Sequence, residues 1–252
     1  MSDNTHISLT PSGTSRFATT HWSIVLAASS PGSTRYQEAI EILCKTYWFP
    51  LYVYLRRRGY DRHQAEDCIQ GFFASLLEKQ GLRLADSDRG KFRSYLLGAL
   101  KHFMADERDR TLTQKRGGAC RVFSLDFDSG EAQYAPEPAH QLSPDKLFER
   151  SWALTVLRGA ASKLEAEWSA IHKQDLFQHL VVYLAPAEKT VSYRDMAAEL
   201  SMSEAAVKTA IYRMRKRYRE LLRGEVAQTV STEEQIEDEL RELFAAFSSE
   251  GA

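Results

Sequence analysis

Lysine and arginine side chains recur along residues 204–223 at spacings that place many of them on one face of a helix. Such groups donate hydrogen bonds to phosphates, and a helix that presents them can enter a major groove and reach base edges. We expect base contacts from Lys208 and Arg213 and phosphate contacts from Arg215, Lys216 and Arg219. The same solvent-facing surface includes three further candidates for DNA contact, which are Glu204, Thr209 and Tyr212.

The elements that must position this face read as a helix-turn-helix. Ser192 and Ser203 are expected N-caps, and Asp195 stands three residues after Ser192, as the acidic partner of a capping box does. Ser201 opens the turn at a position where such motifs often carry glycine, since a positive φ is often needed there. The inward positions are apolar: Met196, Ala197, Leu200, Val207, Ile211, Met214, Tyr218 and Leu221. The alternative is a solvated arginine-rich helix in an ordinary bundle.

The net charge of the chain does not suggest nucleic-acid binding, but the distribution of charge along the chain does. The 252 residues carry a formal net charge of −1, but cations concentrate in residues 56–58, 89–116 and 208–223, and acids dominate after Gly224. Local fields therefore matter more than the net charge. The three cysteines, Cys44, Cys68 and Cys120, lack metal-site or disulfide spacing, and no segment is apolar enough to span a bilayer. We expect a cytoplasmic protein with no metal and no membrane partner.

Helical periodicity dominates the chain and predicts an all-α fold. The expected helices cover residues 36–58, 61–79, 90–110, 144–164 and 165–184, followed by the helix-turn-helix, and a further amphipathic helix covers 232–247. Glycine and proline punctuate residues 111–145, which predicts a linker. The expected organisation is a disordered segment 1–19, a helical domain 20–110, a long linker 111–145, a second helical domain 146–223 and an acidic C-terminal extension 224–252.

One stretch resembles a known family. Residues 65–77, AEDCIQGFFASLL, resemble the AED-x-x-Q-x-x-F signature in region two of extracytoplasmic-function (ECF) sigma factors, which are promoter-specificity subunits of bacterial RNA polymerase. Residues 52–59 resemble the first helix of that region, residues 92–96 with Asp106 and Arg108 resemble its promoter-melting helix, and the helix-turn-helix resembles region four. The phrases QKRGG at 114–118 and LFERSWAL at 147–154 resemble an ECF-like branch seen in planctomycete-type genomes.

The resemblance implies partners and residue roles. Glu66, Asp67 and Gln70 would dock on the β′ clamp of core polymerase, while region four would meet the β flap and the upstream promoter element. Melted promoter DNA would be held by Arg93, Tyr95, Lys101, His102 and Arg108, with Lys91 among the cations that contact phosphates. The family usually has tryptophan at the position of Tyr95 and asparagine at that of His102, and a core role for Tyr95 and an ordinary surface role for His102 stay open. The resemblance allows an anti-sigma factor as a further partner, which the sequence does not identify.

Two other functional classes remain open from sequence. One is a stand-alone helix-turn-helix regulator whose N-terminal bundle senses a ligand or dimerises, and the other is an adaptor that binds no DNA. No phosphate-cradling loop, nucleophile elbow or HExxH pattern is present, so we expect neither catalysis nor a cofactor. The C-terminal helix carries an apolar stripe of Ile236, Leu240, Leu243, Phe244 and Phe247. It is expected either to fold over the DNA-reading face and compete with promoter, or to pack structurally on the second domain.

Overall fold

The computed structural model describes residues 22–86, 90–113, 125–134, 142–184 and 191–247, and for 109–113 the backbone only. Within these ranges the chain is helical and contains no strand, which confirms the predicted all-α class. The elements are α1 (Ser23–Ala28), α2 (Tyr36–Arg57), α3 (Arg62–Glu78), η1 (Gly81–Leu84), α4 (Phe92–Thr113), α5 (Phe127–Gln133), α6 (Pro144–Ala170), α7 (Gln174–Leu180), η3 (Val181–Tyr183), α8 (Tyr193–Glu199), α9 (Glu204–Ala227) and α10 (Glu233–Ala245). No described helix has the length and apolar character needed to cross a membrane.

Two expectations about the connections were wrong. A break between residues 164 and 165 does not exist, because α6 continues to Ala170 and ends where His172 adopts a positive φ of 57°. The segment predicted as a linker contains α5, which begins after Asp126, whose side chain accepts a hydrogen bond from the Ser129 amide. Within that segment residues 122–127 alternate in a strand-like way, and residues 122–124 of this stretch lie outside the described residues.

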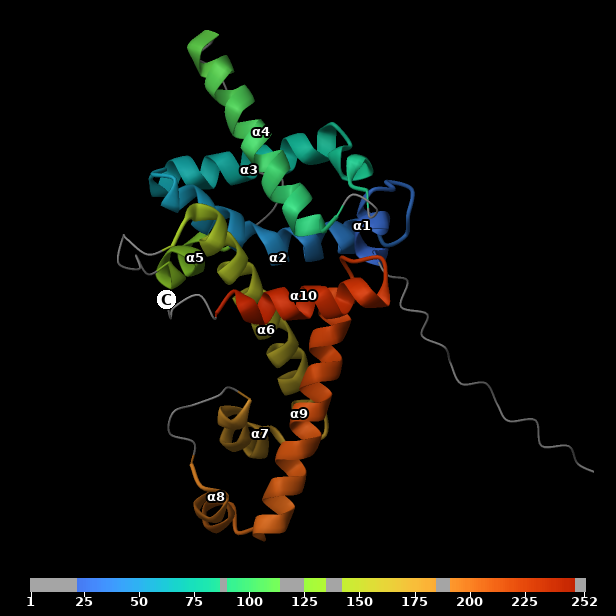
Figure 1. Cartoon of the computed structure of the whole chain (residues 1–252), viewed down its shortest axis with the longest axis vertical. Coiled ribbons are helices and arrows are strands. Elements are labelled where there is room, and N and C mark those ends of the chain that lie inside the picture. Colours follow the sequence, from blue (N-terminus) through green and yellow to red (C-terminus); the bar gives the residue numbers. More distant parts are fainter. Residues whose placement is uncertain (1–21, 87–89, 114–124, 135–141, 185–190, 248–252) are drawn as a thin grey trace, which may run out of the picture.

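The larger hydrophobic core is built around α2, which contacts α1, α3, α4 and α6 (Figure 1). Tyr47, Leu51 and Leu55 are almost fully buried along it, and the helix continues through Pro50 without ending. Aromatic rings interlock at its centre. The Phe92 ring meets the Tyr47 and Trp22 rings edge to face, with centroids 5.4 and 5.9 Å apart, an arrangement that adds to the stabilisation from burial.

A smaller core joins α7 and α8 to parts of α6 and α9 at the opposite end of the molecule (Figure 1). It contains Leu164 of α6 and Met214 of α9, whereas Trp152 earlier in α6 and Leu222 later in α9 belong to the larger core. The division between the two cores therefore falls inside α6 and α9. The predicted second domain, residues 146–223, contributes side chains to both.

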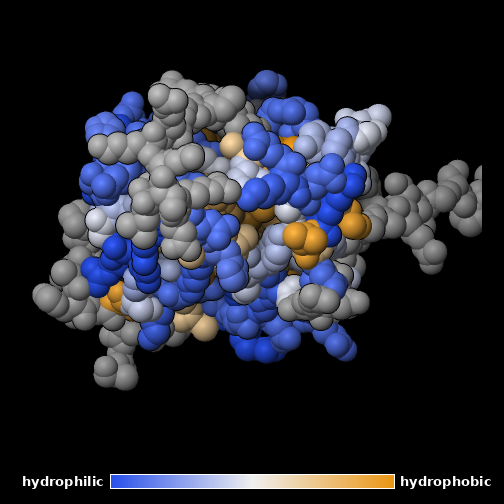
Figure 2. Space-filling model, turned by 90° about the horizontal axis from the view of Figure 1, so that it is seen from above, coloured by the Kyte–Doolittle hydropathy of each residue, from blue (hydrophilic) through white to orange (hydrophobic). Residues whose placement is uncertain are grey.

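The C-terminal helix α10 packs across the C-terminal part of α9 and against α6. Ile236 and Leu243 are buried in the larger core, Leu240 and Phe247 are partly buried, and Phe244 is exposed. The expectation that this helix folds over the DNA-reading face was wrong, because its apolar stripe is used at the other end of α9. The surface seen from above is largely hydrophilic, with hydrophobic side chains in small separate areas (Figure 2).

Candidate nucleic-acid interface

The turn between α8 and α9 has the predicted N-caps, but Asp195 bonds the Ser192 hydroxyl and not the Ser192 amide, so the expected capping box is not formed. The hydroxyl oxygens of Ser192 and Ser203 accept hydrogen bonds from the Asp195 and Ala206 amides at 3.1 and 3.2 Å. The Asp195 carboxylate accepts a bond from the Ser192 hydroxyl at 2.7 Å. Ser201 has φ of 52°, the left-handed conformation expected where related motifs place glycine. These contacts define two helix starts with a tight turn between them.

The inward faces of the two helices form a common apolar contact. Met196 and Ala197 of α8 and Val207, Ile211 and Met214 of α9 are buried together in the smaller core, as the sequence predicts. Further along α9, Tyr218 and Leu221 are only partly buried and Leu222 is the buried residue. This change of face follows from the packing partner, because α9 there leaves the smaller core and enters the larger one.

A tyrosine pair fixes α8 and α9 to the end of η3. The Tyr183 hydroxyl donates to the Val191 carbonyl at 2.8 Å, and the Tyr183 and Tyr193 rings stack with centroids 5.5 Å apart. Arg215 Nε donates to the Tyr183 carbonyl at 2.8 Å, and the Arg215 side chain is partly buried. The expected phosphate contact by Arg215 is therefore corrected to a structural role, since its guanidinium is tied to the backbone of a preceding segment.

The outer face of the first turns of α9 remains open to solvent. Exposed side chains there are Glu204, Lys208, Thr209, Tyr212, Arg213, Lys216 and Arg219. Lys208 Nζ lies 2.6 Å from Glu204 Oε1 and 5.6 Å from the centroid of the Tyr193 ring. Among the described residues, no carboxylate is placed within ion-pair distance of Arg213, Lys216 or Arg219. The large Tyr212 ring is 66% exposed among these cations.

Arg217, unlike the other exposed cations beside it on α9, is held by two carboxylates. Its Nε and Nη2 atoms lie 2.8 and 2.6 Å from the two carboxylate oxygens of Glu167 on α6, and Nη1 lies 2.9 Å from Glu220. The hydrogen bonds raise the pKa of Arg217, and the bond from Arg217 lowers the pKa of Glu167. This bidentate pair fixes the direction of α9 against α6.

The cations predicted on α4 separate into buried and exposed groups. Arg93 is 2% exposed, and its guanidinium lies 3.1 Å from Glu149, 3.1 Å from Glu239 and 2.5 Å from Glu242. It also lies 4.5 Å from the centroid of the Trp152 ring. The prediction that Arg93 contacts DNA is thus corrected for this arrangement, because internal carboxylates and an aromatic ring surround it. Burial raises the pKa of Glu149, and the charge of Arg93 opposes this shift without cancelling it.

Tyr95 also belongs to the interior more than to the surface. Its hydroxyl donates to the Gly81 carbonyl, its ring lies 6.1 Å from Phe92, and burial raises its pKa. The core interpretation of Tyr95 is therefore favoured. Lys101 is exposed on α4, forms an ion pair with Asp145 and lies 5.6 Å from the Tyr54 ring. His102 and Arg108 are exposed on the same helix.

The predicted polymerase-docking residues lie on α3, which begins with a reciprocal capping box between Asp61 and Gln64. Asp67 is exposed and Gln70 is partly exposed. Glu66 is less available, because Arg62 Nε lies 2.7 Å from its carboxylate. Gly71, on the same helix, faces the Phe103 ring of α4. A Cβ at this position would lie 3.3 Å from Phe103 Cζ, so its lack of a side chain allows α4 to pack closely.

Sequence reasoning missed a polar contact between α5 and α2. The Glu131 carboxylate accepts hydrogen bonds from the Tyr52 hydroxyl and from Arg56, and Arg56 lies 4.8 Å from the Tyr134 ring centroid. Gly130 faces the Trp48 ring at a position where a Cβ would clash with it. A seven-residue helix with an internal glycine has too weak a periodicity to be recognised. The Arg56 that appeared to be part of a free basic cluster is consequently paired.

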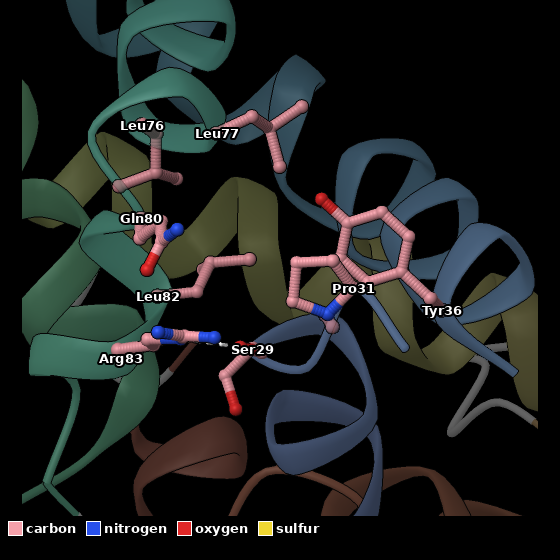
Figure 3. A pocket seen from close by; sticks show the side chains of 9 residues that line it. Ser29, Pro31, Tyr36, Leu76, Leu77, Gln80, Leu82 and Arg83 are labelled. Atoms are coloured by element: carbon pink, nitrogen blue, oxygen red, sulfur yellow. Dashed lines mark hydrogen bonds between the residues drawn. The ribbon is translucent and has the colours of Figure 1, made fainter. Parts of the chain in front are cut away.

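A hollow lies between α1, α2 and the end of α3 (Figure 3). Its empty volume is about 220 Å³, and its walls include Tyr36, Leu77 and Leu82. The charged group in its lining, Arg83, donates from Nε to the Ser29 carbonyl at 3.0 Å. The lining residues bring together no acid–base or nucleophilic pair, so the chemistry of this hollow gives no indication of catalysis.

Comparisons with protein-family models, with curated proteins and with solved structures find no match to this chain. The function is therefore inferred from the surface chemistry of α3, α4 and α9.

Proposed function

We propose that this protein is an ECF-type sigma factor, which binds core RNA polymerase in the cytoplasm and directs promoter recognition and transcription initiation. The observation that carries the proposal is the outer face of α9. Its cations are exposed in the first turns of a capped helix whose opposite face is buried against α8. This combination suits a recognition helix, because the groove-facing side chains are available while the helix itself is held rigidly.

In the proposed complex, α9 enters the major groove of the upstream promoter element. Lys208 and Arg213 contact base edges, and Lys216 and Arg219 contact phosphates. Glu204 contributes a carboxylate that can accept from a cytosine amino group, and the Tyr212 ring and the Thr209 methyl group can contact a thymine methyl group. The pairing of Lys208 with Glu204 is an intrahelical contact on an exposed surface, so it is readily exchanged for a base contact.

The end of the molecule that contains α3 and α4 is proposed to meet the β′ clamp and melted DNA, while the α7–α9 unit at the opposite end meets the β flap. Asp67 and Gln70 present polar groups from α3 to the β′ clamp. Lys101, His102 and Arg108 on α4 contact the separated strand, where cations bind phosphates. In this proposal the chain supplies binding and positioning, and the polymerase performs the chemistry.

The alternative is a stand-alone helix-turn-helix regulator, and one observation favours it. Because α6 and α9 contribute to both cores, the DNA-reading unit is packed continuously with the N-terminal bundle, as in a one-body regulator. Purified protein mixed with bacterial core RNA polymerase distinguishes the two functions. Co-elution with core enzyme and promoter-dependent transcription by the mixture are expected for a sigma factor. A well-folded protein that binds duplex DNA but never associates with core enzyme would instead be a stand-alone regulator.

A further inference from the structure

Glutamate side chains of α10 form ion pairs with the cations at the start of α4. Lys91 Nζ lies 2.9 Å from Glu239 and 2.5 Å from Glu242. The same two glutamates contact the Arg93 guanidinium at 3.1 and 2.5 Å. Arg93 and Glu239 each have only 2% of the side chain exposed, so this contact is internal. One turn of the C-terminal helix thus neutralises Lys91, directly before α4, and Arg93, in its first turn, although both lie more than a hundred residues earlier in the chain.

We propose that α10 is an autoinhibitory helix, whose carboxylates hold in the free protein the α4 cations that would otherwise bind DNA phosphates. This inference rests on the proposed function of α4. Carboxylates and phosphates use the same charged hydrogen-bond donors, so the two compete directly for Lys91 and Arg93. The inhibited surface is the start of α4, at the opposite end of the molecule from the reading face of α9.

The charge balance explains why displacement of α10 would matter. With α10 in place, Lys91 and Arg93 face three carboxylates, those of Glu149, Glu239 and Glu242. Without α10, the two cations face only Glu149, and the surface changes from acidic to basic. Both ion partners described for Lys91 belong to α10, so Lys91 gains most from the displacement.

The attachment of α10 is suited to exchange. Two residues of its apolar stripe, Ile236 and Leu243, are buried, while Phe244 is 54% exposed. The Glu242 carboxylate is the exposed part of this contact, so an incoming phosphate can replace it beside Lys91 without breaking the buried Arg93–Glu239 pair. The other end of α10 pairs Glu233 and Glu237 with Arg223 of α9. The helix therefore neutralises cations from both of the proposed DNA-binding helices.

The test compares full-length variants that differ in one α10 charge. Glu242→Gln removes a partly exposed carboxylate that contacts both α4 cations, whereas Glu234→Gln makes the same change of charge on an exposed part of α10. The probe is a fluorescein-labelled single-stranded oligonucleotide of mixed sequence, without polymerase. Glu242→Gln frees α4 cations for one more phosphate, which should raise affinity about fivefold at 0.1 M salt and steepen the salt slope by about 0.7. Glu234→Gln should bind as the unmodified protein does.

A second substitution tests whether the higher affinity of Glu242→Gln comes from Lys91. Lys91→Gln in the Glu242→Gln background should return affinity close to its starting value. The proposal is overturned if Glu242→Gln and Glu234→Gln bind equally well, or if the higher affinity persists without Lys91. Binding of each protein to core polymerase is measured in parallel. Normal polymerase binding with no effect of Glu242→Gln rejects only the autoinhibitory helix, while failure to bind polymerase rejects the proposed sigma-factor function.

Discussion

The α4 and α9 helices differ in how they place the cations nearest their N-terminal ends. In α9 the cations near the N-terminal end face solvent, because a narrow apolar face supplies all the contacts that α8 needs. In α4 the cation nearest the start, Arg93, is surrounded by α6 and α10. The difference teaches that a basic amphipathic helix indicates nucleic-acid binding only when the elements packed against it leave its cations exposed.

The sharpest test of this contrast is the loss of Arg93. Arg93→Ala leaves Glu239 buried without its main counter-charge, and breaking a buried pair in this way typically costs about 3 to 5 kcal/mol. The free energy of unfolding, from denaturant titration, should fall by that amount. Arg213→Ala, on the exposed face of α9, should change it by less than about 0.5 kcal/mol. Equal stability of the two variants would erase the distinction between the helices.

On the α9 side, base contacts and phosphate contacts should separate. Lys208→Ala or Arg213→Ala should lose about 1 to 3 kcal/mol of discrimination at one base pair, because a side chain that reads a base edge is removed. Lys216→Ala should instead weaken binding to all duplexes and reduce the salt slope by about 0.9. Competition binding against a library of single-base variants measures both. A uniform loss for Lys208→Ala and Arg213→Ala would contradict base readout.

The α3 face extends the comparison to a protein partner. The Asp67→Ala, Gln70→Ala double variant should bind core polymerase roughly ten- to thirtyfold more weakly, about 1.4 to 2 kcal/mol, with no loss of fold because neither side chain is buried. Glu78→Ala, exposed at the end of the same helix, is the matched control. Titration of fluorescently labelled protein with core enzyme gives the affinity. A folded double variant that binds like the control argues against docking through α3.

Stability should fall at alkaline pH because the Cys44 thiol is buried in the larger core. Burial, followed by the nearby Glu41, raises the pKa of the Cys44 thiol from 9.0 to about 12. Between these values the unfolded chain has lost the proton that the folded chain retains, so stability falls as pH rises. The contribution of Cys44 is a loss of about 1.4 kcal/mol by pH 10. Denaturant titrations at pH 8 and 10 under reducing conditions should show a smaller loss for Cys44→Ala than for the unmodified protein, and identical losses would contradict this assignment.

The smallest effect is expected at the turn between α8 and α9. Ser201 has a positive φ, which is costly for any residue with a Cβ. Ser201→Gly should therefore raise the midpoint of thermal unfolding slightly, by the equivalent of roughly 0.5 kcal/mol, after allowance for the greater entropy of glycine in the unfolded chain. DNA affinity should not change. A decrease in stability would show that the serine side chain makes a contribution larger than the backbone strain.

Most helices could be predicted because their signals are local. Caps such as Ser192, Ser203 and Thr232 and a 3.6-residue apolar period are visible in sequence and recur in the structure. The all-α class follows from the same signals. The extra length of α6 and the presence of α5 were missed, because each depends on contacts with elements distant in sequence.

The burial of Arg93 could have been predicted from its place on the apolar face of its helix. Arg93 stands in register with Leu96, Leu97 and Leu100, and Glu239 stands in register with Ile236 and Leu243. A charge on the apolar face of an amphipathic helix is expected to be buried with a partner. Because Arg93 and Glu239 both have this position and carry opposite charges, the sequence could have predicted that they pair with each other. Contacts with a partner depend on the partner's shape as well as on this chain, so the sequence pattern predicts which cations are exposed and does not select among them.

The length of α9 has a mechanical consequence. Its 24 residues make a rod of about 36 Å, with the reading face at one end and the contacts with α10 at the other. Residues of α6 also lie in both cores, and the Arg217–Glu167 pair joins the two helices between them. A displacement at the α10 end is therefore carried by two helices together, which act as a strut that keeps the exposed face of α9 at a fixed distance from the N-terminal bundle.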